Sequence, residues 1–110
     1  MYRVIIAGSR GFKNYRILKE AMDQLLRDLI TDGEDIVIIS GTASGADRLG
    51  ERYAKEKGFQ LRRFPVDWNR YGKSAGYRRN VEMADHADAV VVFWDGQSKG
   101  SKHMLKISKI

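Results

Sequence analysis

The sequence contains no cysteine, a single proline and no long apolar run, and each absence excludes a class of protein. Without cysteine there is no disulfide framework and no thiolate chemistry, so a reducing, cytoplasmic compartment is the expected location. The apolar runs fall well short of the roughly 18 residues of a membrane-spanning helix. The apolar stretch near the N-terminus is too short for the core of a signal peptide. No membrane partner is therefore expected.

The rest of the composition is that of an ordinary globular protein. The 110 residues are 43% hydrophobic and 31% charged. A chain of this length buries well over half of its unfolded surface. We therefore expect one domain that covers residues 1–110.

The net charge is +6, with 20 basic against 14 acidic residues. Such a balance is typical of nucleic-acid-binding proteins, but it also arises when lysine and arginine merely solvate helix faces. The placement of the charge is more informative, because many basic residues lie in or beside glycine-rich connections. These residues are Arg10, Lys13, Arg70, Lys73, Arg78, Arg79, Lys99 and Lys102.

Apolar runs alternate with amphipathic stretches along the whole chain. Strands are expected at Tyr2–Ala7, Ile36–Ser40, Gln60–Phe64 and Asp88–Trp94. A first helix is expected from Asn14, with an apolar stripe from Ile17 to Ile30. A second helix is expected from Ala46 to Gly58, and a third over Tyr77–His86 with Val81 and Ala84 facing inward. A last helix is expected around Met104. The alternation predicts an α/β fold, a parallel sheet of four strands with helices on both faces.

The unusual connections of the chain all follow strands. In a parallel sheet the turns after the strands share the carboxyl edge, where ligands bind. These turns are Gly8–Phe12 (GSRGF), Ser40–Asp47 (SGTASGAD), Pro65–Gly76 and Asp95–Ser101. The turns at the opposite edge are short and plain. The sequence therefore predicts a ligand site at the carboxyl edge.

The stretch SGTASGAD places bare backbone amides at the start of a helix, a physical anion site suited to a phosphate. The alternative is that its small residues only let a helix pack closely on a strand. Asp47 either binds ligand hydroxyls, acts as a catalytic carboxylate, or simply favours the helix dipole. Because amide donors and the dipole stabilise an ionised carboxylate, we expect the pKa of Asp47 to be lowered.

Other side chains at this edge suit a nucleotide. Arg10 offers a fork of donors to a phosphate. Of Arg78 and Arg79, only one can point at the cleft, because neighbours on a helix diverge by about 100°. Three aromatic residues either stack on a purine or cap the core. They are Trp68, Tyr71 and Trp94.

Several known signatures are absent. There is no G-x-G-x-x-G after the first strand, so the dinucleotide fingerprint is missing. Gly72–Ser74 imitates the end of a phosphate loop, but Asp67 stands where its first glycine is required. His86 and His103 have no partners at metal-ligand spacing. We expect neither a metal nor a cofactor.

Four motifs together carry a family resemblance: GSRGF, SGTASGADRLGERYA, FPVDWNRYGKSAGYRRNVEMA and VVVFWDGQSKGSKHM. In this order they resemble the SLOG superfamily, which joins DNA-processing-protein-A-like and LOG-like proteins, and within it the small YspA-like bacterial and phage-associated group. The resemblance implies a Rossmann-like sheet, of four or five strands, that binds nucleotides or their derivatives at its carboxyl edge. By motif, the implied ligand-binding residues are Gly8, Ser9, Arg10, Gly41, Thr42, Ser44, Gly45, Asp47, Arg79, Asn80, Gly96, Ser98, Gly100 and Ser101.

Two departures from that family leave the activity open. LOG-type phosphoribohydrolases carry a glutamate in the last turn, and Met104 stands in its place here. Similar proteins continue into a fifth strand, whereas this chain stops at Ile110, so we expect a four-stranded sheet or an edge covered by a second copy in a homodimer. Asp47 is then the remaining catalytic candidate.

The expected function is binding of a small nucleotide-derived anion of the ADP-ribose or phosphoribosyl type. One alternative is an enzyme that hydrolyses an N-glycosidic or phosphoribosyl bond with Asp47. Another is a single-stranded DNA-binding protein that uses the same basic loops and aromatic residues. The DNA alternative is not favoured.

Overall fold

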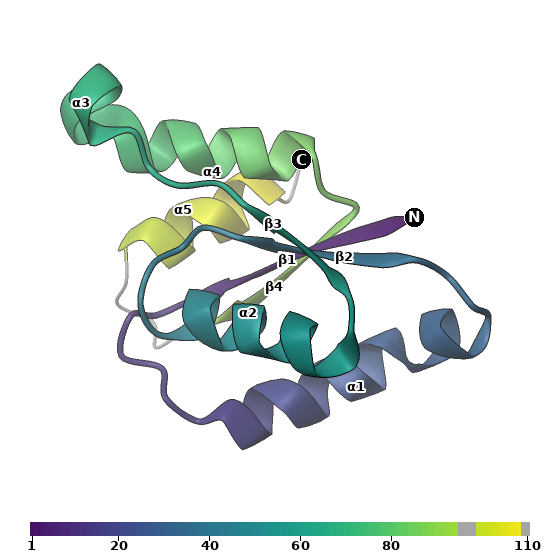
Figure 1. Cartoon of the computed structure of the whole chain (residues 1–110). Coiled ribbons are helices and arrows are strands. Elements are labelled where there is room, and N and C mark those ends of the chain that lie inside the picture. The colour runs from purple at the N-terminus through teal and green to yellow at the C-terminus, as the bar shows by residue number, and fades with distance from the viewer. Residues whose placement is uncertain (95–98, 109–110) are drawn as a thin grey trace.

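The computed structural model describes residues 1–94 and 99–108 (Figure 1). Strands and helices alternate along the chain as the sequence predicts. Their bounds are β1 Tyr2–Gly8, α1 Tyr15–Thr31, β2 Ile36–Ser40, α2 Ala46–Lys57, β3 Gln60–Arg63, α3 Trp68–Tyr71, α4 Ala75–Asp85, β4 Ala89–Phe93 and α5 Lys99–Ser108. A short 3-10 turn, Gly72–Ser74, joins α3 to α4.

The four strands form one parallel sheet in the order β3-β2-β1-β4. Ile5 in β1 stands opposite Ile39 of β2 and Val90 of β4, so β1 is paired on both sides. The predicted α/β, Rossmann-like fold class is confirmed. Within the described residues the sheet has four strands.

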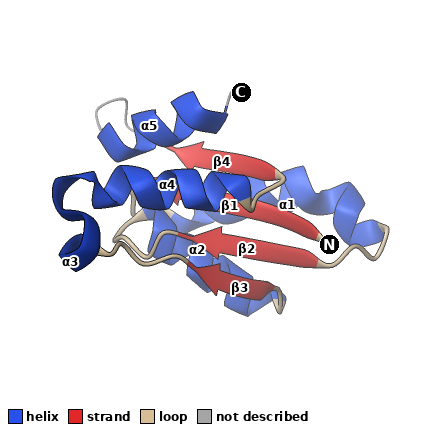
Figure 2. Ribbon diagram, turned by 90° about the horizontal axis from the view of Figure 1, so that it is seen from above, coloured by secondary structure: helices blue, strands red, loops and turns tan. Residues whose placement is uncertain are grey.

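Helices cover both faces of the sheet. In Figure 1, α1 and α2 lie on one face, while α4 and α5 lie on the other, and Figure 2 shows the same two layers from above. The chain builds outward from β1 to β3 and then returns to place β4 on the far side of β1. The strand order therefore reverses between β1 and β4, at the point where open α/β sheets bind ligands.

The core has two parts, because successive residues of a strand face opposite sides of the sheet. Val4 and Ile6 face α1 and α2, whereas Ile5 and Ala7 face α4 and α5. The first cluster comprises Val4, Ile6, Leu18, Met22, Leu26, Ile36, Ile38, Tyr53 and Ala54. The second comprises Ile5, Ala7, Ile39, Phe64, Met83 and Met104.

The apolar stripe of α1 is wider than its contact with the sheet. Asn14 caps the helix as expected, its side chain accepting from the amide of Ile17 at 3.2 Å. Leu18, Met22 and Leu26 are buried. Ile17, Leu25 and Ile30 remain 51%, 59% and 42% exposed. A homodimer that covers them stays a prediction.

The connection after β3 is more helical than the sequence suggests. Asp67 caps α3 by accepting from the amide of Arg70 at 3.1 Å, and α4 starts at Ala75 rather than Tyr77. The prediction that Val81 points inward is wrong, because Val81 is 44% exposed and Met83 is the buried residue of that turn. Side chains two residues apart on a helix point about 200° away from each other, so burying Met83 exposes Val81. Among the described helices, none is long and apolar enough to cross a membrane.

Candidate functional site

A cavity of about 290 Å³ opens at the carboxyl edge of the sheet, where the strand order reverses. Its walls come from the end of β1, the loops after β1 and β2, the first turn of α2, and the helices α4 and α5. The lining residues are Ala7, Gly8, Arg10, Gly41, Ala43, Asp47, Arg79, Asn80, Met83, Lys99, Gly100 and Met104. Among these described lining residues, three are basic, Arg10, Arg79 and Lys99, and one is acidic, Asp47.

The loops after β1 and β2 are packed backbone against backbone. Gly45 precedes α2 at φ +77, and a Cβ there would lie 2.3 Å from the carbonyl oxygen of Ser9. The amide of Ala46 donates to that same carbonyl at 3.3 Å. A Cβ on Gly8 would in turn lie 2.3 Å from the carbonyl oxygen of Phe93. The glycines are therefore required for three chain segments to meet at the cavity.

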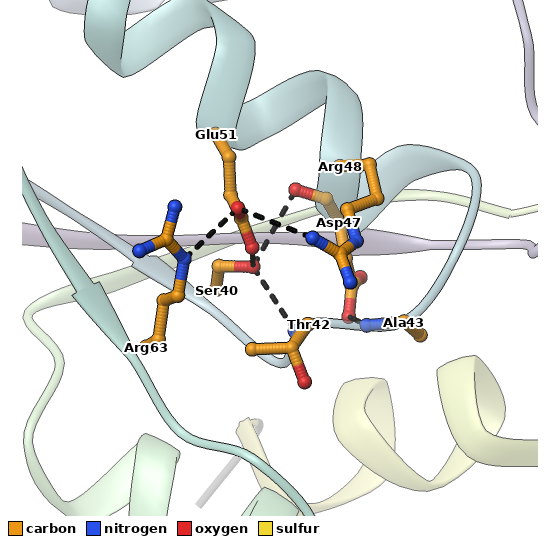
Figure 3. A network of polar contacts seen from close by, with 7 residues as sticks. All are labelled: Ser40, Thr42, Ala43, Asp47, Arg48, Glu51 and Arg63. Carbon is orange, nitrogen blue, oxygen red and sulfur yellow. Dashed lines mark hydrogen bonds and ion pairs between the residues drawn. The ribbon is translucent and has the colours of Figure 1, made fainter.

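The amides of SGTASGAD are partly used within the protein (Figure 3). The amide of Thr42 donates to Oγ of Ser40 at 3.0 Å, and that of Ala43 donates to Oδ2 of Asp47 at 3.1 Å. With the bond from Ala46 to Ser9, three amides expected to face a phosphate already have acceptors. These three amides are therefore not free to bind an anion.

Asp47 is buried in the first turn of α2, and its pKa is raised to about 6. Burial is the main cause, because it removes water from the ionised carboxylate, and the charge of Glu51 adds to the effect. The hydrogen bond from Ala43 and the charges of Arg79 and Arg10 oppose it. The prediction of a lowered pKa is wrong, since desolvation outweighs the helix start.

Of the neighbouring residues Arg78 and Arg79, Arg79 is the one that lines the cavity. Its Nη1 donates to the carbonyl of Gly41, and to that of Phe64 at 3.3 Å. Burial lowers the pKa of Arg79, but a guanidinium keeps its proton in proteins. Arg78 instead donates from Nε to Ser74 Oγ at 3.0 Å and lies over the Tyr71 ring, outside the cavity lining.

Asn80 ties α4 to α5 at the cavity wall. Its Nδ2 lies 3.2 Å from the carbonyl oxygen of Gly100 and 3.3 Å from Nδ1 of His103. Lys99, Met83 and Met104 also line this wall and were not predicted as site residues. The glycine-rich turn around Lys99 was a usable signal for that residue, whereas the methionines look like ordinary core positions in the sequence.

A second cavity of about 570 Å³ lies beside the turn after β1. Its lining residues are Ser9, Gly11, Phe12, Lys13, Asn14, Val92, Phe93 and Trp94. The rings of Phe12 and Phe93 lie 5.1 Å apart, and Trp94 is 38% exposed. Gly8 and Arg10 line the first cavity, while Ser9 and Gly11 line this one, so one turn borders both.

The remaining predicted site residues fall elsewhere. Trp68 is 56% exposed on α3, and Tyr71 lines a smaller cavity beside Arg78. Thr42 and Ser44 belong to the loop after β2 without lining the first cavity, and Ser101 belongs to α5. Gly96 and Ser98 lie outside the described residues. In the part of the chain that the structure describes, no group of three acidic or histidine side chains is placed to hold a metal ion.

Comparison with known proteins identifies the family. A family model described as the YspA, cpYpsA-related SLOG family matches residues 2–71. The chain belongs to this SLOG family. The "Gene 61 protein" of Mycobacterium phage D29 is 35% identical, over 96% of this chain and 87% of its own length. No solved structure matches. The resemblance seen in the sequence, including its phage association, is thus confirmed.

The SLOG match covers only part of the cavity. Residues 2–71 supply the turns after β1 and β2, with Arg10, Gly41 and Asp47. Arg79, Asn80 and Lys99 come from α4 and α5, beyond the matched segment. The rest of the cavity lining therefore comes from residues beyond the matched segment.

Proposed function

We propose that this SLOG-family protein binds a small nucleotide-derived anion, of the ADP-ribose or phosphoribosyl type, at the carboxyl edge of the sheet. The observation that carries the proposal is the cavity where the strand order reverses, lined by Arg10, Arg79 and Lys99 around glycine backbone. Family membership supports a nucleotide-related ligand in general. The charge of the cavity wall supports an anionic one.

The phosphate is assigned to the basic side chains and the ribose to Asp47. Arginine and lysine donate charge-assisted hydrogen bonds to phosphate oxygens. Asp47 has one oxygen, Oδ2, accepting from Ala43, and a carboxylate has further lone pairs that accept from hydroxyl groups. A cavity of about 290 Å³ is at the small end of ligand sites, which suits a phosphoribosyl group.

The base is assigned to the second cavity. Trp94 is the stacking candidate that lines a cavity together with other aromatic side chains, Phe12 and Phe93. Rings of this kind provide flat surfaces for a purine. Since the turn Gly8–Phe12 borders both cavities, a nucleotide lying across this turn would use both.

Titration calorimetry tests this function. The probes are ADP-ribose, AMP, inorganic phosphate and adenosine, and the variants are Arg10→Gln and Lys99→Gln. Loss of a charged contact costs roughly 1.5–3 kcal/mol, so each variant should weaken ADP-ribose binding about 10- to 100-fold. Arg16→Gln is the control, because the side chain of Arg16 is 87% exposed on α1. Absence of ADP-ribose and AMP binding, or equal affinity in all three variants, would overturn the proposal.

One observation favours hydrolysis as a second candidate. A buried carboxyl group with a pKa of about 6 in a cavity is typical of acid–base catalysts. Against it, Asp47 is the only acid among the described lining residues, and Met104 lines the wall in place of the glutamate of LOG-type enzymes. Glycoside hydrolysis generally uses two carboxyl groups. Binding without turnover is therefore the function we favour.

A further inference from the structure

A polar network centred on the buried residues Ser40 and Glu51 joins β2, α2 and β3 at the base of the loop after β2 (Figure 3). Ser40, fully buried at the end of β2, donates its hydroxyl group to Oε2 of Glu51 at 2.7 Å. Oε1 of Glu51 accepts from Nε of Arg63 at 3.0 Å and lies 3.8 Å from Nη1 of Arg48. Glu51 is only 5% exposed and does not line the cavity. Its charge is thus compensated by two arginines and one hydroxyl group.

Glu51 determines where the hydroxyl proton of Ser40 points. A serine hydroxyl group has one proton and two lone pairs. The other acceptor for that proton, the backbone carbonyl of Asp47, lies 3.5 Å away. A carboxylate at 2.7 Å is the stronger acceptor. With the proton held by Glu51, a lone pair of Ser40 is left for the amide of Thr42, which donates at 3.0 Å.

Thr42 needs this hydrogen bond because its backbone is strained. Among residues 1–94 and 99–108, Thr42 is the one non-glycine residue with positive φ, at 66°. The left-handed conformation is unfavourable for a residue with a β-branched side chain, and it persists only where the surrounding structure imposes it. Its two neighbours, Gly41 and Ala43, line the cavity. Relaxation of Thr42 would therefore move the cavity wall.

We infer that Glu51 is a positioning residue for the ligand site, acting through the Ser40 hydroxyl group to hold Thr42 and its neighbours in the binding conformation. Arg63 fixes Glu51 from β3. The inference rests on the proposed function, since it concerns the loop that borders the proposed ligand. The added residue, Glu51, lies on α2, 11 residues after the end of β2, and does not line the cavity.

Two measurements on the variants Glu51→Gln and Ser40→Ala test this role. The first is the affinity for ADP-ribose, and the second is amide hydrogen exchange followed by NMR. Glutamine has the shape of glutamate without its charge. Glu51→Gln should make the Thr42 amide exchange at least about tenfold faster, while the amide of Ile38 within β2 keeps its protection. A loop that is competent in about a tenth of molecules weakens ADP-ribose binding about tenfold.

The controls separate positioning from simple structural support. Glu20→Gln removes a carboxylate that is 67% exposed on α1 and paired with Arg16, and it should change neither measurement. The double variant Ser40→Ala/Glu51→Gln should bind no more weakly than Ser40→Ala alone, because both act through one hydrogen bond. Should Ser40→Ala fail to fold, Glu51→Gln decides by itself.

Three outcomes would overturn the inference. The first is Glu51→Gln matching Glu20→Gln in both measurements. The second is parallel loss of protection at Thr42 and Ile38, which shows general destabilisation. The third is unchanged affinity despite fast Thr42 exchange. If the unmodified protein binds no ADP-ribose, the proposed function fails, and the exchange of Thr42 still shows whether Glu51 holds the loop.

Discussion

The carboxylate of Asp47 and the guanidinium of Arg79 both lie against the α-carbon of Gly41, where a Cβ would be 2.8 Å from an atom of each. The two groups come from α2 and α4, which cover opposite faces of the sheet (Figure 1). There is room for both groups only because Gly41, the residue that follows β2, has no side chain. Asp47 is the member of this pair that titrates, so its protonation is the first property to test.

Asp47 makes the folded protein less stable as pH rises. Its pKa is about 6 in the folded protein and about 3.9 in an unfolded chain. Between these values the folded state binds more protons, so the free energy of unfolding falls as pH rises from about 4 to 6, by at most about 3 kcal/mol. Asp47→Asn should remove this fall and be the more stable protein at pH 7.

Urea denaturation at several pH values measures the effect. Asp28→Asn is the matched control, because Asp28 is an exposed acid on α1. If the unmodified protein and Asp47→Asn show parallel stability profiles between pH 4 and 6, the burial of Asp47 does not control its ionisation.

Gly45 should tolerate no side chain. Its φ is +77, which strains the backbone of any other residue, and an added Cβ would lie 2.3 Å from the carbonyl oxygen of Ser9. Gly45→Ala should therefore lower the free energy of unfolding by about 3 kcal/mol or more. Gly11→Ala is the control, since nothing lies within 4 Å of a Cβ there, and its effect should stay within about 1 kcal/mol. Equal denaturation midpoints for the two variants would contradict the close backbone packing between the loops after β1 and β2.

Nucleotide turnover should be slow or absent. Asp47 is the only acid among the described lining residues, and Met104 lines the wall that would hold a second one. Incubation of the protein with AMP and ADP-ribose, followed by chromatography, should show no base release near the ordinary enzymatic rate of about 1 per second. Release at that rate, abolished in an Asp47→Asn variant that still binds, would make the protein a hydrolase.

Single-stranded DNA should bind weakly at physiological salt. A strand bound along the basic loops would neutralise several phosphates, and the logarithm of its affinity would fall by about 0.7 per contact for each tenfold rise in salt. A cavity for one nucleotide accounts for only one or two contacts. Fluorescence anisotropy with a labelled oligonucleotide measures this slope. Submicromolar affinity with a slope of about four contacts would favour the DNA-binding alternative.

The fold was predictable because its signals are local. Gly58 ends α2 in the left-handed conformation, at φ 74, as expected of a glycine after a helix. The buried run Ile36–Ser40 forms β2 with the predicted bounds. The position of the loop after β2, at the carboxyl edge, follows from the parallel arrangement of the strands. These features depend on residues that are neighbours in the chain.

The chemistry of the site was less predictable because it depends on distant contacts. The sequence shows Asp47 at a helix start but not the burial that raises its pKa. Ser40 and Glu51 are 11 residues apart, and only the packing of α2 on β2 brings them to 2.7 Å. Helix geometry alone could not choose between Arg78 and Arg79. The family resemblance implied Arg79, and the orientation of α4 places Arg79 at the cavity. Binding of a nucleotide and self-association remain predictions.

NMR titration of the ¹⁵N-labelled protein with ADP-ribose tests the central claim most directly, because each amide reports whether the ligand is near. We expect saturable shifts concentrated at Gly8–Arg10, Gly41–Gly45 and Lys99–Gly100, the backbone around the cavity. Gly33 and Gly58, in turns at the opposite edge, should not move. Absence of shifts at millimolar ADP-ribose, or shifts centred on Gly33 and Gly58, would contradict a nucleotide site at the carboxyl edge.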